Sequence, residues 1–448
     1  MIFNQLKNYL KPTDIYTSQR LMLCLMKVAG FLPLQITEDR NGRRLQVSAM
    51  GYTLSILMCT FNVVCFIAIG TNGRATTLSY LFDRPRLSQI GTSVKMLSII
   101  IMVPLLYGSS LRTAKKMTTS MQYISNIDKR LHLIGIDVDY WKEFYHSFFV
   151  IAFIVTHFVL VLVMSTWQNG VLEVKALILQ QDPMKKDLIK DVTVALWLGL
   201  VTHHLSLVTM TIINCYYATV IREIRERFRG VNRMLKCMSE SASEATADRD
   251  IESIGSTSWN IRHNSQIYNL VDELYSIHND LCDTCVIVSE YFSLKIVSVI
   301  ATGFMTMVMN GYYFVLSGSQ ADQKDKQVDL VYTSIESICV ALAIILACNS
   351  ASSITTENEK CSAHVHRVLS SINAPDTKNK LLEFSLQLIN RKIEFSGFGL
   401  FVINRALLLG IAEAITTYFL ILVEFNASDS NTPRSHSDVS KSMSFLGS

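Results

Sequence analysis

The chain has 448 residues, of which 50% are apolar and 17% are charged, and its formal net charge is +4. Soluble globular domains carry about 25% charged residues, so this composition excludes an ordinary soluble protein. The apolar residues are also gathered into long blocks, which is typical of a membrane protein.

Seven apolar blocks approach or reach the length that a transmembrane helix needs, which is about 17–25 residues. The blocks are residues 47–69, 90–107, 144–164, 192–218, 291–315, 330–348 and 398–423. Buried helices of a large soluble core are the alternative explanation for such blocks. We expect an all-α membrane protein with seven transmembrane helices.

The N-terminal segment, residues 1–46, is basic. Its residues 21–34 are apolar but are interrupted by Lys27, which favours a short interfacial or re-entrant helix over a cleavable signal. Arg40, Arg43 and Arg44, just before the first block, fit contact with lipid phosphates. No aromatic or repetitive pattern accompanies them, so we expect no nucleic-acid partner.

The distribution of basic residues predicts the orientation. The N-terminal segment and the second and sixth loops carry 19 lysines and arginines, whereas the odd-numbered loops and the C-terminal tail carry 11. Cytoplasmic loops are enriched in lysine and arginine. The N-terminus should therefore be cytoplasmic and the C-terminus extracellular, which is the reverse of a G-protein-coupled receptor.

The pattern between the blocks predicts a domain organisation. Residues 47–348 hold six transmembrane helices with an outer ligand pocket, and the 219–290 loop extends these helices into the cytoplasm. Apolar stripes at helical spacing in this loop and in residues 349–397 predict a helical cytoplasmic anchor domain. A polar linker is expected at residues 239–258. The seventh helix should span residues 398–425, followed by a disordered extracellular tail, 426–448.

Candidate ligand-binding residues lie in the outer halves of the spans. They combine aromatic and polar side chains, as a small-molecule pocket requires: His157, Trp167, Trp197, His203, Asn310, Tyr312, Tyr313, Tyr332, Thr333 and Glu336. An interfacial aromatic belt has a similar composition and remains an alternative for the tyrosines near span ends. Glu336 is the best single candidate, because an acid inside a span is costly and is usually functional.

The sequence contains no clear enzyme motif, and we expect neither catalysis nor a cofactor. The pair Cys282 and Cys285 has the spacing of a zinc or redox site but lacks a second pair. His203, His204, His364 and His366 lack obvious partners. We therefore predict no metal site.

The last block is unusual because one helical face carries polar side chains, including Glu413, Thr417 and Glu424. Such a face points towards protein or water rather than lipid. Thr417 and Tyr418, five residues, then Glu424 and Phe425 resemble the Thr-Tyr-x5-Gln-Phe signature at the end of insect gustatory receptors. Glu424 departs from the usual glutamine.

This resemblance implies a ligand-gated non-selective cation channel for a small-molecule tastant, in the plasma membrane of gustatory sensory neurons. It further implies a homotetramer, or a heterotetramer with related receptors, around a pore lined by the last helix. Tyr418, Ile421, Glu424 and Phe425 would then face the pore, with Glu424 and Phe425 at the gate. Without a pore, Glu424 would simply reach the aqueous interface.

Two other classes remain open at this point. A metabotropic seven-helix receptor would require the opposite orientation, and a secondary transporter would require internal repeats and broken helices, which we do not find. The ligand is not identified by the sequence. The sixth span is poor in tryptophan and phenylalanine, which slightly favours a ligand other than a sugar.

Overall fold

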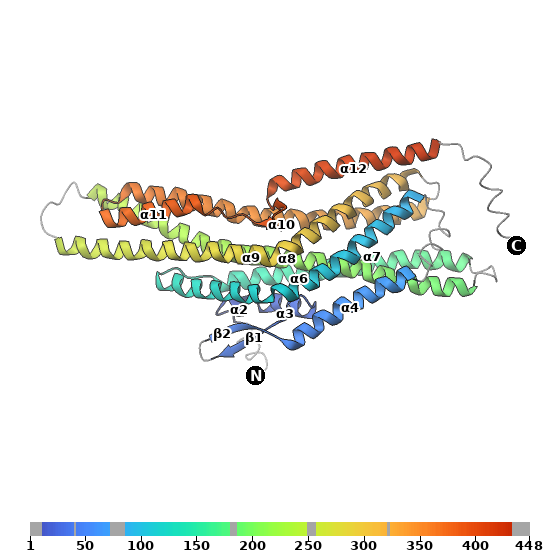
Figure 1. Cartoon of the computed structure of the whole chain (residues 1–448), viewed down its shortest axis with the longest axis horizontal. Coiled ribbons are helices and arrows are strands. Elements are labelled where there is room, and N and C mark those ends of the chain that lie inside the picture. The colour runs from blue at the N-terminus through green and yellow to red at the C-terminus, as the bar shows by residue number, and fades with distance from the viewer. Residues whose placement is uncertain are drawn as a thin grey trace.

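The computed structural model describes residues 11–39, 42–71, 86–179, 186–248, 257–319 and 323–431. Long helices dominate it (Figure 1). They are α2 (Ile15–Ser18), α3 (Arg20–Val28), α4 (Ala49–Thr71), α6 (Arg86–Leu133), α7 (Tyr140–Leu179), α8 (Lys186–Asp248), α9 (Thr257–Ser319), α10 (Gln323–Ser371), α11 (Pro375–Asn390) and α12 (Arg405–Asn431).

Seven of the described helices are long and apolar enough to cross a membrane: α4, α6, α7, α8, α9, α10 and α12. Each of them overlaps one of the seven predicted blocks, so the prediction of a seven-span helical protein is confirmed. Five are much longer than a bilayer requires, since α6, α7, α8, α9 and α10 have 48, 40, 63, 63 and 49 residues. At 1.5 Å per residue, 63 residues extend over about 95 Å, roughly three times the hydrocarbon thickness.

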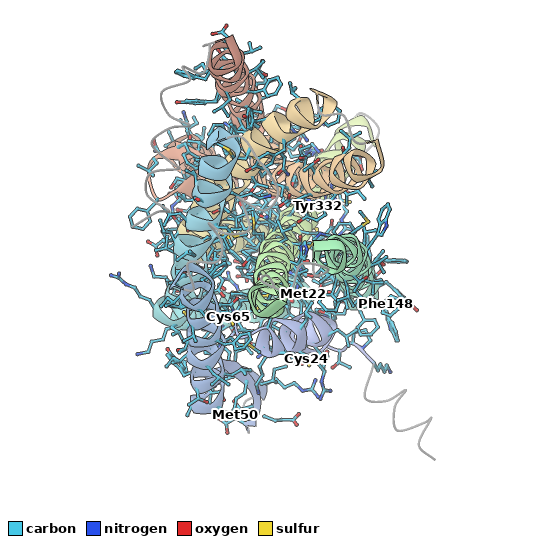
Figure 2. All side chains as sticks on the ribbon, turned by 90° about the vertical axis from the view of Figure 1, so that its right-hand side faces the viewer. Met22, Cys24, Met50, Cys65, Phe148 and Tyr332 are labelled. Atoms are coloured by element: carbon cyan, nitrogen blue, oxygen red, sulfur yellow. The ribbon has the colours of Figure 1, made fainter. Side chains whose placement is uncertain are left out.

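The long helices form an elongated bundle with α11 near one end (Figure 1). The C-terminus of α12 points towards the opposite end. Viewed along the bundle, α12 stands apart from the other helices, Tyr332 lies within the bundle and Phe148 lies at its edge (Figure 2). The most apolar part of α8 is 94% buried, whereas that of α12 is 0% buried. The core is thus built around α8, and α12 is peripheral within one chain.

A short turn between α6 and α7 reverses the direction of the chain. Gly135 has φ +83°, a left-handed conformation that favours glycine after a helix. Around it, the Ile136 N–H donates to the Leu131 carbonyl at 2.8 Å and the Gly135 N–H donates to the His132 carbonyl at 3.1 Å. The chain reverses within a few residues, so the start of α7 lies against the end of α6.

Two short hairpins differ from the all-helical expectation. β1 (Leu34–Asp39) pairs antiparallel with β2 (Gly42–Val47), and Leu34 lies opposite Val47. Residues 21–34 were predicted as a helix, but α3 ends at Val28, and the chain then enters β1. Met22, Leu23 and Met26 of α3 are buried, because α3 packs on the bundle.

The last helix begins later than predicted. Residues 396–402 form a second hairpin, in which β3 (Ser396–Gly397) pairs with β4 (Phe401–Val402), and α12 starts at Arg405. The Ile403 N–H donates to the Phe395 carbonyl at 2.7 Å, which closes the hairpin. A Cβ on Gly397 would lie 2.8 Å from Val297, so the hairpin packs tightly against α9. The apolar residues of 398–404 therefore lie in the hairpin and directly after it, and not in α12.

The predicted polar linker at 239–258 also begins later. α8 continues to Asp248, and residues 249–256 lie outside the described residues, as do residues 432–448 of the predicted tail. The serines and acids after Ser239 do not end the helix. Its preceding apolar stripe, including Ile224, Phe228 and Leu235, is fully buried and holds the helix in place.

Candidate functional site

Glu336 on α10 forms a buried ion pair with Lys95 on α6. The Lys95 Nζ atom lies 2.7 Å from Glu336 Oε2, and the two side chains are 10% and 1% exposed. Lys95 lies inside a predicted span but was not assigned to the site. A charged side chain inside a membrane span needs a partner, because an isolated charge there costs on the order of a few kcal/mol of free energy. The ion pair explains how both residues are tolerated.

Asn310 on α9 completes this cluster. Its Nδ2 donates to Glu336 Oε2 at 3.0 Å and to Ser337 Oγ at 3.1 Å, and its Oδ1 accepts from Lys95 Nζ at 3.2 Å. The consecutive helices α9 and α10 thus meet the distant helix α6 at one polar point. We call Lys95, Asn310, Glu336 and Ser337 the outer polar cluster.

The other predicted ligand residues differ in how they lie relative to the outer polar cluster. Tyr312 is 2% exposed and its ring lies 5.9 Å from that of Tyr313. The Thr333 carbonyl accepts from Asn310 Nδ2 at 3.5 Å, which puts Thr333 beside the outer polar cluster. Trp197 and His203 lie on α8, but their side chains are outside the described part of the structure.

Neighbouring side chains that the sequence did not single out as a pair also reach this region. The His204 ring lies edge-on to Tyr332, with 5.6 Å between centroids. A Cβ on Gly91 would lie 2.8 Å from Met309 Sδ and 3.2 Å from the Tyr313 hydroxyl oxygen. α6 therefore approaches α9 closely here, and glycine makes the approach feasible.

The predicted pore residues lie on the exposed surface of α12. Tyr418, Ile421 and Phe425 are 54%, 41% and 64% exposed, and Glu424 is also exposed. At about 100° per residue they cover an arc of about 120°, with Tyr418 and Phe425 nearly aligned and Glu424 at one edge. Tyr418 also contacts Phe304 of α9, at 5.9 Å between ring centroids.

Arg405 and Glu413 precede these residues along α12. Arg405 Nε donates to Asn349 Oδ1 at 3.0 Å, so this arginine ties the start of α12 to α10. Glu413 is exposed. Beyond Glu413 the helix meets α9 at Gly311, where a Cβ would lie 3.2 Å from the Phe419 ring. α12 is attached to α9 and α10 along one side, and its other sides face away from the chain.

The cysteine pair lies in the interior. Cys282 and Cys285 are both buried on α9, and Cys282 Sγ lies 3.7 Å from His278 Nδ1. His278 in turn contacts Asn358 Oδ1 at 2.8 Å. Among the described residues, no group of three or more histidine, cysteine, aspartate or glutamate side chains could hold a metal ion.

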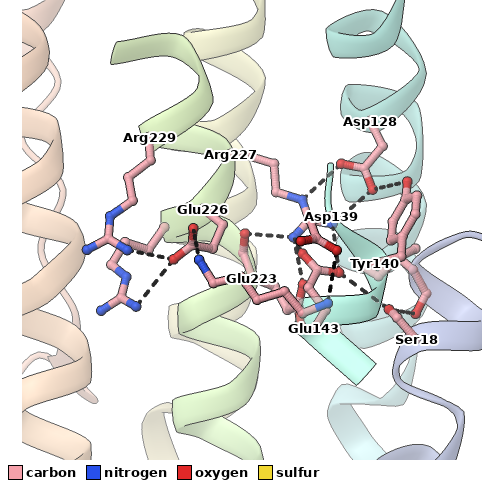
Figure 3. A network of polar contacts seen from close by, with 12 residues as sticks. Ser18, Asp128, Asp139, Tyr140, Glu143, Glu223, Glu226, Arg227 and Arg229 are labelled. Carbon is pink, nitrogen blue, oxygen red and sulfur yellow. Dashed lines mark hydrogen bonds and ion pairs between the residues drawn. The ribbon is translucent and has the colours of Figure 1, made fainter. Parts of the chain in front are cut away.

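A second buried polar cluster, which shares no residue with the outer polar cluster, surrounds Arg227 on α8 (Figure 3). Its guanidinium donates to both oxygens of Asp128 at 2.9 Å each, to Glu223 Oε2 at 2.6 Å and to Glu143. Tyr140 donates to Asp128 at 2.9 Å and Ser18 donates to Glu143 at 3.4 Å. One arginine thus joins α2, α6, α7 and α8.

α11 is fastened to α9 by Lys380. Its Nζ lies 2.9 Å from Asp272 and 4.3 Å from the centroid of the Tyr275 ring. The hydrogen bond with Asp272 raises the pKa of Lys380, so the ammonium stays charged. Leu381, Phe384 and Leu388 are buried on this side of α11, whereas Leu382, Leu386 and Ile389 are exposed.

The sequence of residues 19–428 matches the model of one family, described as the 7tm chemosensory receptors. The chain belongs to the 7tm chemosensory receptor family. This match confirms the resemblance read from Thr417, Tyr418, Glu424 and Phe425. Gustatory receptors are receptors and channels without enzymatic activity, so this family member is not an enzyme.

Two curated relatives from Drosophila melanogaster align with nearly the whole chain. The protein named "Putative gustatory receptor 28b" is 23% identical over 437 residues, covering 95% of this chain and 89% of the relative. The protein named "Putative gustatory receptor 28a" is 20% identical over 450 residues, covering 95% of each protein. This chemosensory receptor is therefore a distant homologue of both, and the alignment covers all seven spans.

The fold resembles that of an insect olfactory receptor. The structure of olfactory receptor OR5 from Machilis hrabei with eugenol matches with a TM-score of 0.57 and 13% identity, covering 91% of this chain and 97% of OR5. At this identity, the match establishes a shared fold. The chemosensory receptor is thus a multi-pass membrane protein with the helical arrangement of insect olfactory receptors.

Proposed function

We propose that this chemosensory receptor is a ligand-gated, non-selective cation channel opened by a small-molecule tastant. The observation that supports this most is α12, whose most apolar segment is 0% buried although α12 carries the exposed Glu413. A carboxylate on the surface of a membrane helix is costly in lipid. Several copies of α12 around an aqueous axis remove that cost, because their acids then face water.

In such an assembly, the exposed Phe425 side chains meet near the outer end of the pore. A ring of aromatic side chains closes a narrow conduit by excluding water, and a ring of Glu424 carboxylates attracts cations. We assign Phe425, with Tyr418 and Ile421, to the gate, and Glu424 to cation selection. The glutamate in place of the family's usual glutamine should strengthen the preference for cations.

The orientation proposed is a cytoplasmic N-terminus and an extracellular C-terminus, supported by the excess of basic residues in the even-numbered loops. α11 and the ends of α8 and α10 then form the proposed cytoplasmic anchor domain. The exposed Leu382, Leu386 and Ile389 of α11 have no lipid to cover there. We propose that these stripes hold four subunits together, either identical or from related receptors.

The proposed stimulus site includes the outer polar cluster, with Tyr312 and Thr333 beside it and Trp197 and His203 as further candidates. The OR5 complex contains eugenol, a small molecule, which supports a small ligand for the same fold. Lys95, Asn310 and Glu336 provide donors and acceptors, so a polar ligand fits better than a purely apolar one. A ligand opens the channel only if it binds the open state more tightly.

The test is patch-clamp recording from cells that express the chain alone, while sugars, bitter compounds and nucleosides are applied. We expect a stimulus-dependent cation current in the wild type. Phe425→Ala should produce current without a stimulus, and Glu424→Gln should reduce the ratio of cation to anion permeability.

Two matched variants serve as controls. Phe149→Ala on α7 removes a phenylalanine that is 68% exposed, and Glu359→Gln on α10 removes an exposed acid outside α12. Both should behave as the wild type. If surface expression is verified and the receptor co-expressed with related subunits still passes no current under any condition, the channel proposal is wrong.

A further inference from the structure

A cavity with a volume of about 570 Å³ lies between the start of α7 and the C-terminal halves of α8 and α10. This size falls within the range of about 300–1,000 Å³ that is usual for small-molecule sites. It is separate from the outer polar cluster, whose residues are not among its walls. In the proposed orientation, the cavity belongs to the cytoplasmic extension of the bundle, towards the end that carries α11 (Figure 1).

The α8 wall of the cavity is strongly basic. Arg222, Arg229, Arg233 and Lys236 all line it, and their spacing of seven, four and three residues puts them on one helical face. α7 adds Lys142 and α10 adds Lys360. Glu226 is the acid on the same face of α8.

The acids on the walls are already engaged. Glu226 lies 2.7 Å from Arg229, 3.5 Å from Arg225 and 3.8 Å from Lys142. Figure 3 shows the contact between Glu226 and Arg229. Glu357 lies 3.0 Å from Arg229 and 3.1 Å from Lys360. Two carboxylates are therefore shared among four cations.

The remaining acids also have partners. Glu143 binds Arg227 and Asp137 lies 2.7 Å from His132 Nδ1. Asp139 accepts a hydrogen bond from the Lys142 N–H at 3.0 Å. None of them is paired with Arg222 or Arg233, and no carboxylate of the described residues lies within 4.0 Å of either arginine. The cavity thus has two guanidinium groups in excess.

Two polar atoms on the walls lack a hydrogen-bond partner within the described part of the chain: Asn232 Oδ1 and His364 Nδ1. Asn232 is 6% exposed, and its Nδ2 is already used to donate to the Glu357 carbonyl at 2.9 Å. Its free oxygen can accept a hydrogen bond from a hydroxyl group. An unpaired buried acceptor is costly, so a ligand that supplies the donor stabilises this region.

We propose that this cavity binds a phosphorylated polyol on the cytoplasmic side. The guanidinium groups of Arg222 and Arg233 match phosphate oxygens in geometry and charge. The Asn232 amide oxygen then accepts from a ring hydroxyl. The ligand is either the headgroup of a phosphoinositide lipid or a soluble inositol phosphate, since both carry phosphates on a hydroxylated ring. This site is separate from the stimulus site and does not depend on the proposed channel activity.

Binding is tested with the purified full-length protein in nanodiscs of uncharged lipid. Inositol trisphosphate is titrated by calorimetry, and phosphatidylinositol bisphosphate is added to nanodiscs in a separate series. Arg222→Gln combined with Arg233→Gln should raise the dissociation constant of the probe by about tenfold or more, because two charge-assisted contacts are lost. Arg112→Gln combined with Lys129→Gln removes two exposed α6 charges outside the cavity and should leave the affinity unchanged.

The two probes distinguish the sources. Binding of the soluble trisphosphate supports a soluble ligand, and binding of the lipid alone supports a headgroup site. If the double variant does not fold, Arg233→Gln alone carries the test, because this side chain is exposed. The proposal is overturned if neither probe binds the wild type, or if the cavity and control variants weaken binding equally.

Discussion

At the scale of single residues, the buried pair of Lys95 and Glu336 stands out from the other ion pairs. Its N–O distance of 2.7 Å equals that of Lys116 and Glu290, but the latter side chains are 45% and 53% exposed. A buried charge that loses its partner remains uncompensated, whereas an exposed one is solvated by water. The two pairs therefore form a matched comparison.

We predict that Glu336→Leu or Lys95→Met lowers the free energy of unfolding by roughly 3–5 kcal/mol, since each leaves one buried charge unpaired. The double variant should be less destabilised than either single variant. Lys116→Met or Glu290→Leu should cost about 0–1 kcal/mol. Thermal unfolding in detergent measures these differences. Equal losses for the buried and exposed pairs would show that the outer polar cluster is not formed as described.

Arg227 is also a buried charge with charged partners, but here one cation is paired with three carboxylates. One guanidinium faces the carboxylates of Asp128, Glu143 and Glu223, and its side chain is 0% exposed. The bidentate contact with Asp128 needs the planar arginine fork, which lysine does not provide. The cluster fixes the turn at Gly135 relative to α8, which also shapes the wall of the neighbouring basic cavity.

At the scale of elements, α11 has two apolar faces, of which one is buried against the chain and the other is exposed. Leu381, Phe384 and Leu388 pack on the chain, while Leu382, Leu386 and Ile389 are 45%, 59% and 62% exposed. The second set follows the i, i+4, i+7 spacing of a helix that packs against a partner. Since α11 is not among the candidate spans, lipid does not explain this stripe.

We predict that replacing Leu382, Leu386 and Ile389 together by serine prevents assembly, because the stripe that joins subunits becomes polar. Size-exclusion chromatography with light scattering should show a tetramer for the wild type and a smaller species for the triple variant. Leu133→Ser removes an apolar side chain that is 83% exposed at the end of α6, and it should leave the tetramer intact. A tetrameric triple variant would exclude α11 as the main contact.

At the scale of the whole molecule, the orientation in the membrane separates the proposed channel from a metabotropic seven-helix receptor. A tag placed after Ser448 should be labelled by antibody on intact cells, because α12 runs outward in the proposed orientation. A tag before Met1 should be labelled only after permeabilisation. The reverse pattern would contradict both the channel orientation and the cytoplasmic location of the basic cavity.

The sequence by itself determined the features that depend on local composition. Each span is a contiguous apolar run whose partition into lipid depends on its own residues, so all seven were predictable. The signature at Thr417, Tyr418, Glu424 and Phe425 is also contiguous, and it indicated the family correctly. Glu336 was notable without a structure because an acid within a span is costly wherever its helix lies.

The partners of Glu336 could have been suspected from depth. Lys95 lies five residues after the start of its predicted span, Glu336 six residues after the start of its own, and Asn310 five residues before the end of its span. With the predicted orientation, all three lie at a similar depth. Depth alone does not bring them together, however, because it leaves open which helices are neighbours.

Only the tertiary structure determined which helices are neighbours. Helix packing selects which faces of α6, α9 and α10 meet, and this choice depends on side chains hundreds of residues apart, such as Lys95 and Glu336. The same holds for Arg227 with Asp128 and Glu143, and for the late start of α12 at Arg405, where hairpin contacts outweigh local apolar character. Composition determines that a segment enters the membrane, whereas packing between distant segments determines which side chains meet.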